Sequence, residues 1–366
     1  MNIFAVLSAF RSSQHAGPVG GGEISNRQLL EKLAERGHAV TVYAFNAGAD
    51  GGRADGDVHV VDGGLGRPGG AIKSIFRAAR TRERLGIALS GCRPDVILTS
   101  AGTVGSALYL SKRCRAPVAV MVRAVRDMQP PKGSPLKRVA KRLVYGGSYW
   151  TQAPYLIANS RFLLDHCRQN GFGGVGWVVY PPVDVEIAAG AWPSRVRSIG
   201  MVGNSSQKGI EVFLMLAAKL PEIGFKVIGD RSVAPGTSIL SNNVTRVGWT
   251  NDPVAEIDTC DALLMPTQFD EAFGRAAVEA VRRKKFVIAS RLGGLPEAVG
   301  DPALLVDPTD FEGWHRKVSR LISNPEEFVQ PMCRAVEVAK SFELAAQVEG
   351  MEEAIRGMIV DSAGQS

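Results

Sequence analysis

The sequence of 366 residues lacks several features that define whole classes of protein. No run approaches the roughly 18 apolar residues that a membrane-spanning helix needs. The five cysteines lie far apart without a CxxC pair, which argues against a zinc ribbon or a disulfide framework and indicates a reducing cytoplasm. No basic segment precedes the apolar start MNIFAVLSAF, so we expect a buried first strand there and not a secretion signal.

The composition is that of a globular protein, with 45% apolar and 22% charged residues and enough length for two domains. The net charge of +7 is unevenly distributed along the chain. Residues 1–182 carry 24 Lys+Arg against 11 Asp+Glu, or +13, whereas residues 183–366 carry 19 against 25, or −6. We expect the basic half to face an anionic partner, the alternative being helix faces that are merely solvated.

Short apolar runs alternate with helical patterns along the whole chain. In the first half, strands are expected over 2–8, 38–45, 94–100, 116–122, 155–160 and 175–180. After Pro181-Pro182 the pattern restarts, with strands expected over 197–203, 225–230, 244–249, 261–266, 285–290 and 303–307. Such alternation predicts an α/β fold with parallel sheets covered on both faces.

We therefore predict two Rossmann-like domains, 1–182 and 183–340, that face a central cleft. An amphipathic helix over 341–366 follows and crosses back to the first domain. In open sheets of this kind, ligands bind at the carboxyl ends of the strands.

Two glycine-rich segments each join a strand to a helix. In the first, Gly21 and Gly22 let the backbone approach a ligand, and the helix behind them offers free N–H groups to an anion. It is not a GxGxxG, and no acidic residue ends the second strand, so an NAD site is disfavoured. In the second segment, Lys208 precedes the helix, which suits a diphosphate, although a solvated loop lysine is the simpler alternative.

An acidic loop follows the strand that ends at Pro266. Glu271 lies just before a helix expected to begin near Phe273, and Glu279 lies two turns inside that helix. Two carboxylates eight residues apart can hold hydroxyls at both ends of an elongated polar ligand. Backbone amides around Phe273 and Gly274 would then face an anion in the middle.

These residues carry a resemblance that extends over nearly the whole chain. It resembles the retaining GT-B glycosyltransferases of family 4, whose E-x7-E signature is matched by Glu271 and Glu279 within EAFGRAAVEAVRRKKFVIASRLGGLPEAV. Other matching segments follow in the family's order: GGGEISNRQLLEKLAERGHAVTVYA, LIANSRFLLDHC, VVYPPVD and MVGNSSQKG.

The resemblance implies a nucleoside-diphosphate sugar as donor, with Glu271 and Lys208 as the catalytic residues. Glu271 would hold the sugar, Lys208 would neutralise the leaving diphosphate, and Glu279 would bind the ribose. Trp249 either stacks on the donor base or packs between the domains. The full set of donor-binding residues that we expect is Gly21, Gly22, Gly203, Asn204, Lys208, Phe273, Gly274, Arg275, Glu279 and Trp249.

The sequence has no DxD pair at a strand end where Mg²⁺ would bind, so we expect no metal and no cofactor. In a retaining GT-B enzyme the leaving phosphate itself can take the acceptor's proton on the same face of the sugar. Catalysis would then consist mostly of positioning and electrostatic stabilisation.

The chain departs from the family pattern at two places. Asn204 stands where the family usually has an arginine, and Arg275 is our candidate to replace that cation. The family also has a histidine, commonly His-Asp, after the fourth strand of the first domain, whereas this chain has Arg123 followed by Arg126-Asp127. Arg126-Asp127 either contacts sugar or acceptor there or forms an ordinary surface ion pair.

We expect the acceptor on the basic first half, near Arg123, Arg126, Asp127 and His15. His15 lies in the loop before the glycines, and the alternative is a loop histidine without a functional role. A basic amphipathic helix expected over 134–146 can lie on an anionic membrane surface, track a phosphate backbone, or pack its apolar stripe on the sheet. The expected location is cytoplasmic, with possible peripheral attachment to the inner face of the membrane.

Three functions fit these observations. The first is transfer of a sugar to a saccharide or lipid-linked acceptor, which is anionic in view of the basic half. The second is the same chemistry on a nucleic acid, such as a hydroxylated base in modified DNA, and it ranks lower because few aromatics interleave with the basic cluster. The third is a nucleotide-sugar-binding or epimerase-like protein without transfer.

Overall fold

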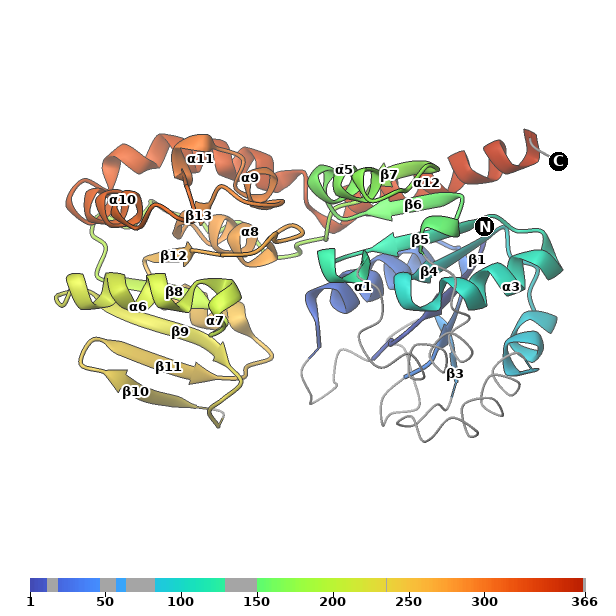
Figure 1. Cartoon of the computed structure of the whole chain (residues 1–366), viewed down its shortest axis with the longest axis horizontal. Helices are drawn as coiled ribbons and strands as arrows, with labels where there is room; N and C mark the ends of the chain where they lie inside the picture. Colours follow the sequence, from blue (N-terminus) through green and yellow to red (C-terminus); the bar gives the residue numbers. More distant parts are fainter. Residues whose placement is uncertain (12–18, 47–56, 64–82, 129–149, 235, 365–366) are drawn as a thin grey trace. The chain divides into compact units, whose positions relative to one another are not determined.

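A computed structural model of the chain describes residues 1–11, 19–46, 57–63, 83–128, 150–234 and 236–364. The chain divides into two compact units, coloured along the sequence in Figure 1. The first unit comprises Met1–Pro182 together with Leu344–Ser366, and the second comprises Val183–Glu343. Each unit contains a seven-stranded sheet.

The sheet of the first unit has the strand order β3-β2-β1-β4-β5-β6-β7, and all of its strand pairs are parallel. Its strands are β1 (Asn2–Leu7), β2 (Ala39–Ala44), β3 (His59–Asp62), β4 (Val96–Ser100), β5 (Val118–Val122), β6 (Tyr155–Ala158) and β7 (Val175–Val178). Its helices include α1 (Gly21–Glu35), α3 (Val104–Cys114), α5 (Arg161–Gln169) and α12 (Leu344–Gly364), with short 3-10 helices η1 (Ala101–Thr103), η2 (Val125–Met128) and η3 (Trp150–Gln152).

The C-terminal helix α12 belongs to the core of the first unit, although the whole second unit precedes it in the sequence. Its apolar face buries Met351 and Ile355 in the same cluster as Leu29 and Leu33 of α1. Figure 1 shows the red α12 alongside this unit. Burial of a Leu, Ile or Met side chain stabilises by about 1.5–3 kcal/mol, so this face fixes the helix to the unit.

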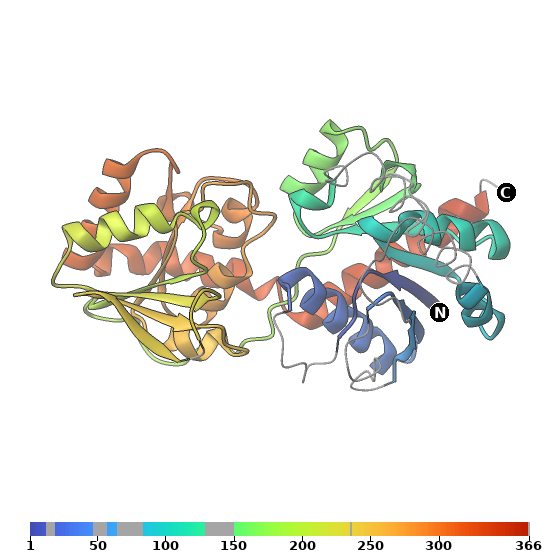
Figure 2. The same cartoon turned by 60° about the horizontal axis from the view of Figure 1, so that its bottom comes forward.

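The sheet of the second unit has the order β10-β11-β9-β8-β12-β13-β14. Its strands are β8 (Ser198–Val202), β9 (Gly224–Asp230), β10 (Thr237–Ser241), β11 (Val244–Gly248), β12 (Ala262–Met265), β13 (Phe286–Ser290) and β14 (Leu305–Val306). Its helices are α6 (Ile210–Lys219), α7 (Pro253–Asp258), α8 (Arg275–Arg282), α9 (Leu295–Val299), α10 (Phe311–Ser323) and α11 (Glu326–Lys340), with short 3-10 helices η4 (Ser206–Lys208) and η5 (Pro302–Leu304). Figure 2 shows α6 and α7 on opposite faces of this sheet.

The predicted fold class is confirmed, because both units are α/β with Rossmann-like sheets. One strand was missed: β10 pairs antiparallel with β11 at the sheet edge. Its residues are mostly exposed, so the segment has no run of buried apolar positions that would identify a strand. The strand expected over 303–307 is shorter than predicted, because Asp301 and Pro302 begin the 3-10 helix η5 and leave β14 only Leu305–Val306.

Candidate functional site

Two loops of the second unit meet at the carboxyl ends of the neighbouring strands β8 and β12. The backbone N–H of Gln268 donates a hydrogen bond of 2.8 Å to the carbonyl of Gln207, which joins the loops directly. Gly209 lies against Pro266 so closely that a Cβ on it would be 2.6 Å from the Pro266 carbonyl carbon. Its φ of +80° is also one that glycine adopts without strain. This glycine therefore allows the close packing of the two loops.

Lys208 and Glu271, the two residues predicted to be catalytic, form an ion pair across this junction. Their side chains are 32% and 18% exposed, so both remain reachable from solvent. The Lys208 ammonium also lies 5.4 Å from the centroid of the Phe269 ring, a favourable cation–π distance. The Ser205 hydroxyl accepts a hydrogen bond of 3.3 Å from the Lys208 backbone N–H and so fixes the turn before the lysine.

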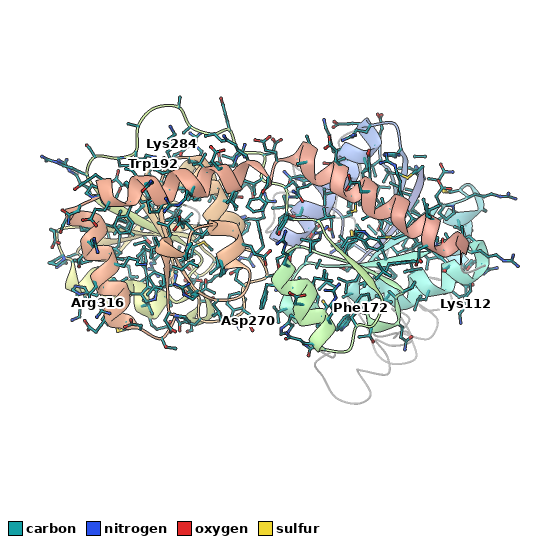
Figure 3. The ribbon with its side chains drawn as sticks, turned by 90° about the horizontal axis from the view of Figure 1, so that it is seen from above. Lys112, Phe172, Trp192, Asp270, Lys284 and Arg316 are labelled. Atoms are coloured by element: carbon teal, nitrogen blue, oxygen red, sulfur yellow. The ribbon has the colours of Figure 1, made fainter. Side chains whose placement is uncertain are left out.

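Gly293 and Gly294, between β13 and α9, contact the backbone of Glu271. The Gly294 N–H donates a 2.7 Å hydrogen bond to the Glu271 carbonyl. A Cβ on Gly293 would lie 2.7 Å from the Glu271 nitrogen, so only glycine fits there. Sequence reasoning gave this pair no role, although its two consecutive glycines are a visible signal. Asp270, labelled in Figure 3, marks the loop that it supports.

Helix α8 carries the second predicted carboxylate, Glu279, one turn after its first residue. Gly274 precedes the helix with a φ of +108°. Glu279 is 8% exposed, and its Oε1 lies 3.5 Å from Nη2 of Arg275 one turn earlier. Phe273 is 2% exposed and packs edge-on against Phe342, so its side chain belongs to the core of the unit. Arg275 thus forms an ion pair with a carboxylate of its own helix. The idea that Arg275 replaces the cation of the missing loop arginine stays a prediction.

Asn204 is held by the end of the neighbouring strand. Its side-chain amide donates to Asp230, the last residue of β9, which is 2% exposed. The Asp230 carboxylate also accepts hydrogen bonds of 2.8 Å from the Ser232 N–H and 2.6 Å from the Ser232 hydroxyl. Sequence reasoning did not single out Asp230, because its partner Asn204 is 26 residues away in the chain.

Trp249 follows strand β11 and is half-buried. Its Nε1–H donates a 3.2 Å hydrogen bond to Asn251, which fixes the ring orientation. The guanidinium carbon of Arg231 lies 4.6 Å from the ring centroid. The indole thus lies at the same sheet edge as the two loops, as part of an arginine–tryptophan stack that the sequence did not suggest.

In the first unit, the two predicted glycines, Gly21 and Gly22, are the first two residues of helix α1. A Cβ on Gly22 would be 2.8 Å from the Cβ of Arg123, so this glycine permits close packing as well as any ligand contact. Arg123 is 8% exposed and donates hydrogen bonds of 2.8 Å to Asn26 and 2.9 Å to the Val179 carbonyl. Burial lowers the pKa of its guanidinium to about 10. The predicted acceptor residue is thus embedded in the protein.

Arg126 and Asp127 do not form the surface ion pair that was one of the two expectations. Instead, the Asp127 carboxylate accepts hydrogen bonds from the backbone N–H groups of Arg123 and Ala124, at 3.0 and 2.9 Å. Burial raises the pKa of this carboxyl group, whereas Arg126 is exposed. Two further predictions, His15 and the basic helix over 134–146, lie outside the described residues.

Two findings concern the described ranges only. No helix there combines the length and apolarity needed to cross a membrane. The same ranges contain no group of three or more His, Cys, Asp or Glu side chains placed to hold a metal ion.

Two Rossmann-like units, with the Lys208–Glu271 ion pair at the carboxyl edge of the second sheet, are features shared with the GT-B class of glycosyltransferases. Family models agree for both halves. Residues 19–187 match Glycosyltransferase Family 4, and residues 196–324 match Glycosyl transferases group 1. The chain belongs to glycosyltransferase family 4.

Curated relatives are similar to parts of the chain. An uncharacterised glycosyltransferase of Methanocaldococcus jannaschii is 33% identical over 129 residues, which cover 33% of this chain and 36% of the relative. The D-inositol 3-phosphate glycosyltransferase of Corynebacterium diphtheriae is 32% identical over 181 residues, which cover 44% of this chain and 42% of the relative. The matches thus span less than half of these relatives' lengths.

Solved structures share the fold over nearly the whole chain. A sucrose-phosphate synthase of Thermosynechococcus elongatus has a TM-score of 0.73 at 18% identity, covering 99% of this chain and 100% of that one. Anabaena HepE, solved in complex with UDP-glucose, has a TM-score of 0.71 at 19% identity, covering 98% and 100%. At these identities the likeness concerns the fold.

Proposed function

We propose that the protein is a retaining, metal-independent glycosyltransferase that uses a nucleoside-diphosphate sugar as donor. The acceptor hydroxyl oxygen forms a bond to the anomeric carbon as the bond from that carbon to the diphosphate oxygen breaks. The acceptor's proton passes to the leaving phosphate oxygen on the same face of the sugar, so the anomeric configuration is kept and no protein nucleophile is required.

The Lys208–Glu271 ion pair is the observation that carries this proposal. It places a cation and a carboxylate side by side at the carboxyl edge of the sheet, next to the N-terminus of α8. A bound donor would give Lys208 its diphosphate as a new anionic partner and leave Glu271 to accept hydrogen bonds from sugar hydroxyls. Charge that develops on the leaving group would then meet a prepositioned ammonium and the helix dipole, without a metal.

The donor and acceptor classes follow from charge and from the relatives. UDP-glucose is the first donor to test, because the similar HepE was solved with it. For the acceptor we propose an anionic hydroxyl compound, either a phosphorylated polyol or saccharide or a lipid-linked saccharide. The +13 charge of residues 1–182 favours an anion, and several relatives are named D-inositol 3-phosphate glycosyltransferases.

The test is an activity screen of the full chain with UDP-, GDP- and ADP-glucose against these acceptors, with and without EDTA. We expect product with one donor family, unchanged by EDTA, and with retained anomeric configuration by NMR. Lys208→Met should lower kcat by about 10²–10³-fold, the usual effect of removing one charge-stabilising contact. Glu279→Gln should raise KM for the donor.

Lys219→Met is the matched control, because Lys219 is an exposed residue at the far end of α6, where its ammonium lies over the Phe311 ring. It should retain activity within about twofold, as is usual for surface substitutions. Equal losses in Lys208→Met and Lys219→Met would refute the role of Lys208. An inverted product, or activity abolished by EDTA, would refute the mechanism.

A further inference from the structure

Arg231 and Trp249 emerge side by side from the second sheet. Asp230 at the end of β9 and Gly248 at the end of β11 are register partners across the parallel strands. Arg231 directly follows Asp230, and Trp249 directly follows Gly248. The guanidinium carbon of Arg231 lies 4.6 Å from the indole centroid. An arginine held over an aromatic ring loses part of its rotamer freedom before any ligand arrives.

Arg231 forms no ion pair with the adjacent carboxylate of Asp230. Asp230 is already occupied by the Asn204 amide and by both donors of Ser232, and Nη1 of Arg246 lies 3.7 Å from its other oxygen. Within the described ranges no carboxylate forms an ion pair with Arg231, which is an exposed residue. Its five N–H donors are therefore available to an anion.

The strand order places this free cation next to the site described above. Strand β9 lies between β11 and β8, and neighbouring strands are about 4.8 Å apart. Asn204, in the Lys208 loop, bonds directly to the residue that precedes Arg231. In contrast to Arg231, Lys208 is paired with Glu271 and Arg275 with Glu279.

We infer that Arg231 is a diphosphate-binding residue of the donor site and that Trp249 is the residue that positions it. A diphosphate carries more charge than one lysine neutralises, and a guanidinium fork contacts two phosphate oxygens at once. This inference rests on the proposed function, since it assumes that a nucleoside diphosphate binds at this edge.

The experiment measures equilibrium binding of UDP and of uridine to the full chain by calorimetry, with GDP and guanosine and ADP and adenosine in parallel. Arg231→Gln should weaken binding of the diphosphate at least about tenfold and leave the nucleoside within about twofold. Arg231→Lys should restore part of the loss, because it keeps the charge without the fork. Arg316→Gln is the matched control: it removes one positive charge from α10, where Arg316 is exposed and pairs with Asp310.

Trp249→Leu tests the positioning role. It should weaken diphosphate binding in the wild-type chain but add little to Arg231→Gln, because residues that act through one another are not additive. Additive losses would overturn the positioning role. Circular dichroism melts identify any variant that fails to fold.

Three results would overturn the role of Arg231 itself. These are unchanged diphosphate binding in Arg231→Gln, an equal loss in Arg316→Gln, or a parallel loss of the nucleoside, which would make Arg231 a base contact. In each case binding by the wild-type chain leaves the proposed function standing. Absence of binding by the wild-type chain would instead remove both proposals together.

Discussion

Gly209 provides a quantitative test of how the site is assembled. A Cβ at this position would lie 2.6 Å from the carbonyl carbon and 3.1 Å from the ring Cγ of Pro266, and φ is +80°. The obstacle is mostly backbone, and the Gln268–Gln207 hydrogen bond holds that backbone in place. Gly209→Ala therefore cannot be accommodated by a rotamer change.

The expected cost has two parts. A residue with a Cβ in the left-handed region costs about 1–2 kcal/mol. Forcing extra volume into a packed contact typically costs a further ~1–3 kcal/mol. We expect Gly209→Ala to lower the free energy of unfolding by about 2–5 kcal/mol and to weaken donor binding, because Lys208 precedes it.

Gly190→Ala separates the two parts. Gly190 belongs to the same unit and has a φ of +91°, but a Cβ added to it would meet nothing within 4 Å. It should therefore show the conformational cost of about 1–2 kcal/mol alone. The assay is urea unfolding of both variants followed by circular dichroism. The packing argument is refuted if the free energies of unfolding of the two variants differ by less than about 0.5 kcal/mol, the uncertainty within which effects at independent sites usually add.

Two further predictions concern the first unit. Gly22→Ala should lower the free energy of unfolding by about 1–3 kcal/mol, because its Cβ would lie 2.8 Å from the Cβ of Arg123. Gly350→Ala, in open space on α12, should instead raise the free energy of unfolding by about 0.4–1 kcal/mol in the same assay. Equal effects of the two substitutions would contradict the close packing at Gly22. The hydrogen bond from His38 lowers the pKa of Glu352 below its ordinary value of 4.5, so its stabilisation is present above pH 4.5 and is lost as the pH falls through the lowered pKa. Glu352→Gln should cost about 1–3 kcal/mol at neutral pH and flatten the acid side of a melting-temperature series; an unchanged acid profile would contradict this assignment.

The sequence by itself determined the architecture and the loops that carry the site residues. Parallel strands and helices have local periodicities, so alternation of the two patterns was enough to predict both Rossmann-like sheets. The positions of Lys208, Glu271 and Glu279 at strand ends and helix starts were visible for the same reason. Signals of this kind need only a few neighbouring residues.

The tertiary structure decided which of these side chains meet. The hydrogen bond of buried Arg123 to Asn26, the Asp230 anchor of Asn204 and the contact of Arg231 with Trp249 each join residues that are far apart in the sequence. The edge strand β10 escaped prediction because its exposed residues have no buried periodicity. Contacts of this kind depend on strand order and register, which are fixed by the packing of the whole sheet and are not encoded in any single segment.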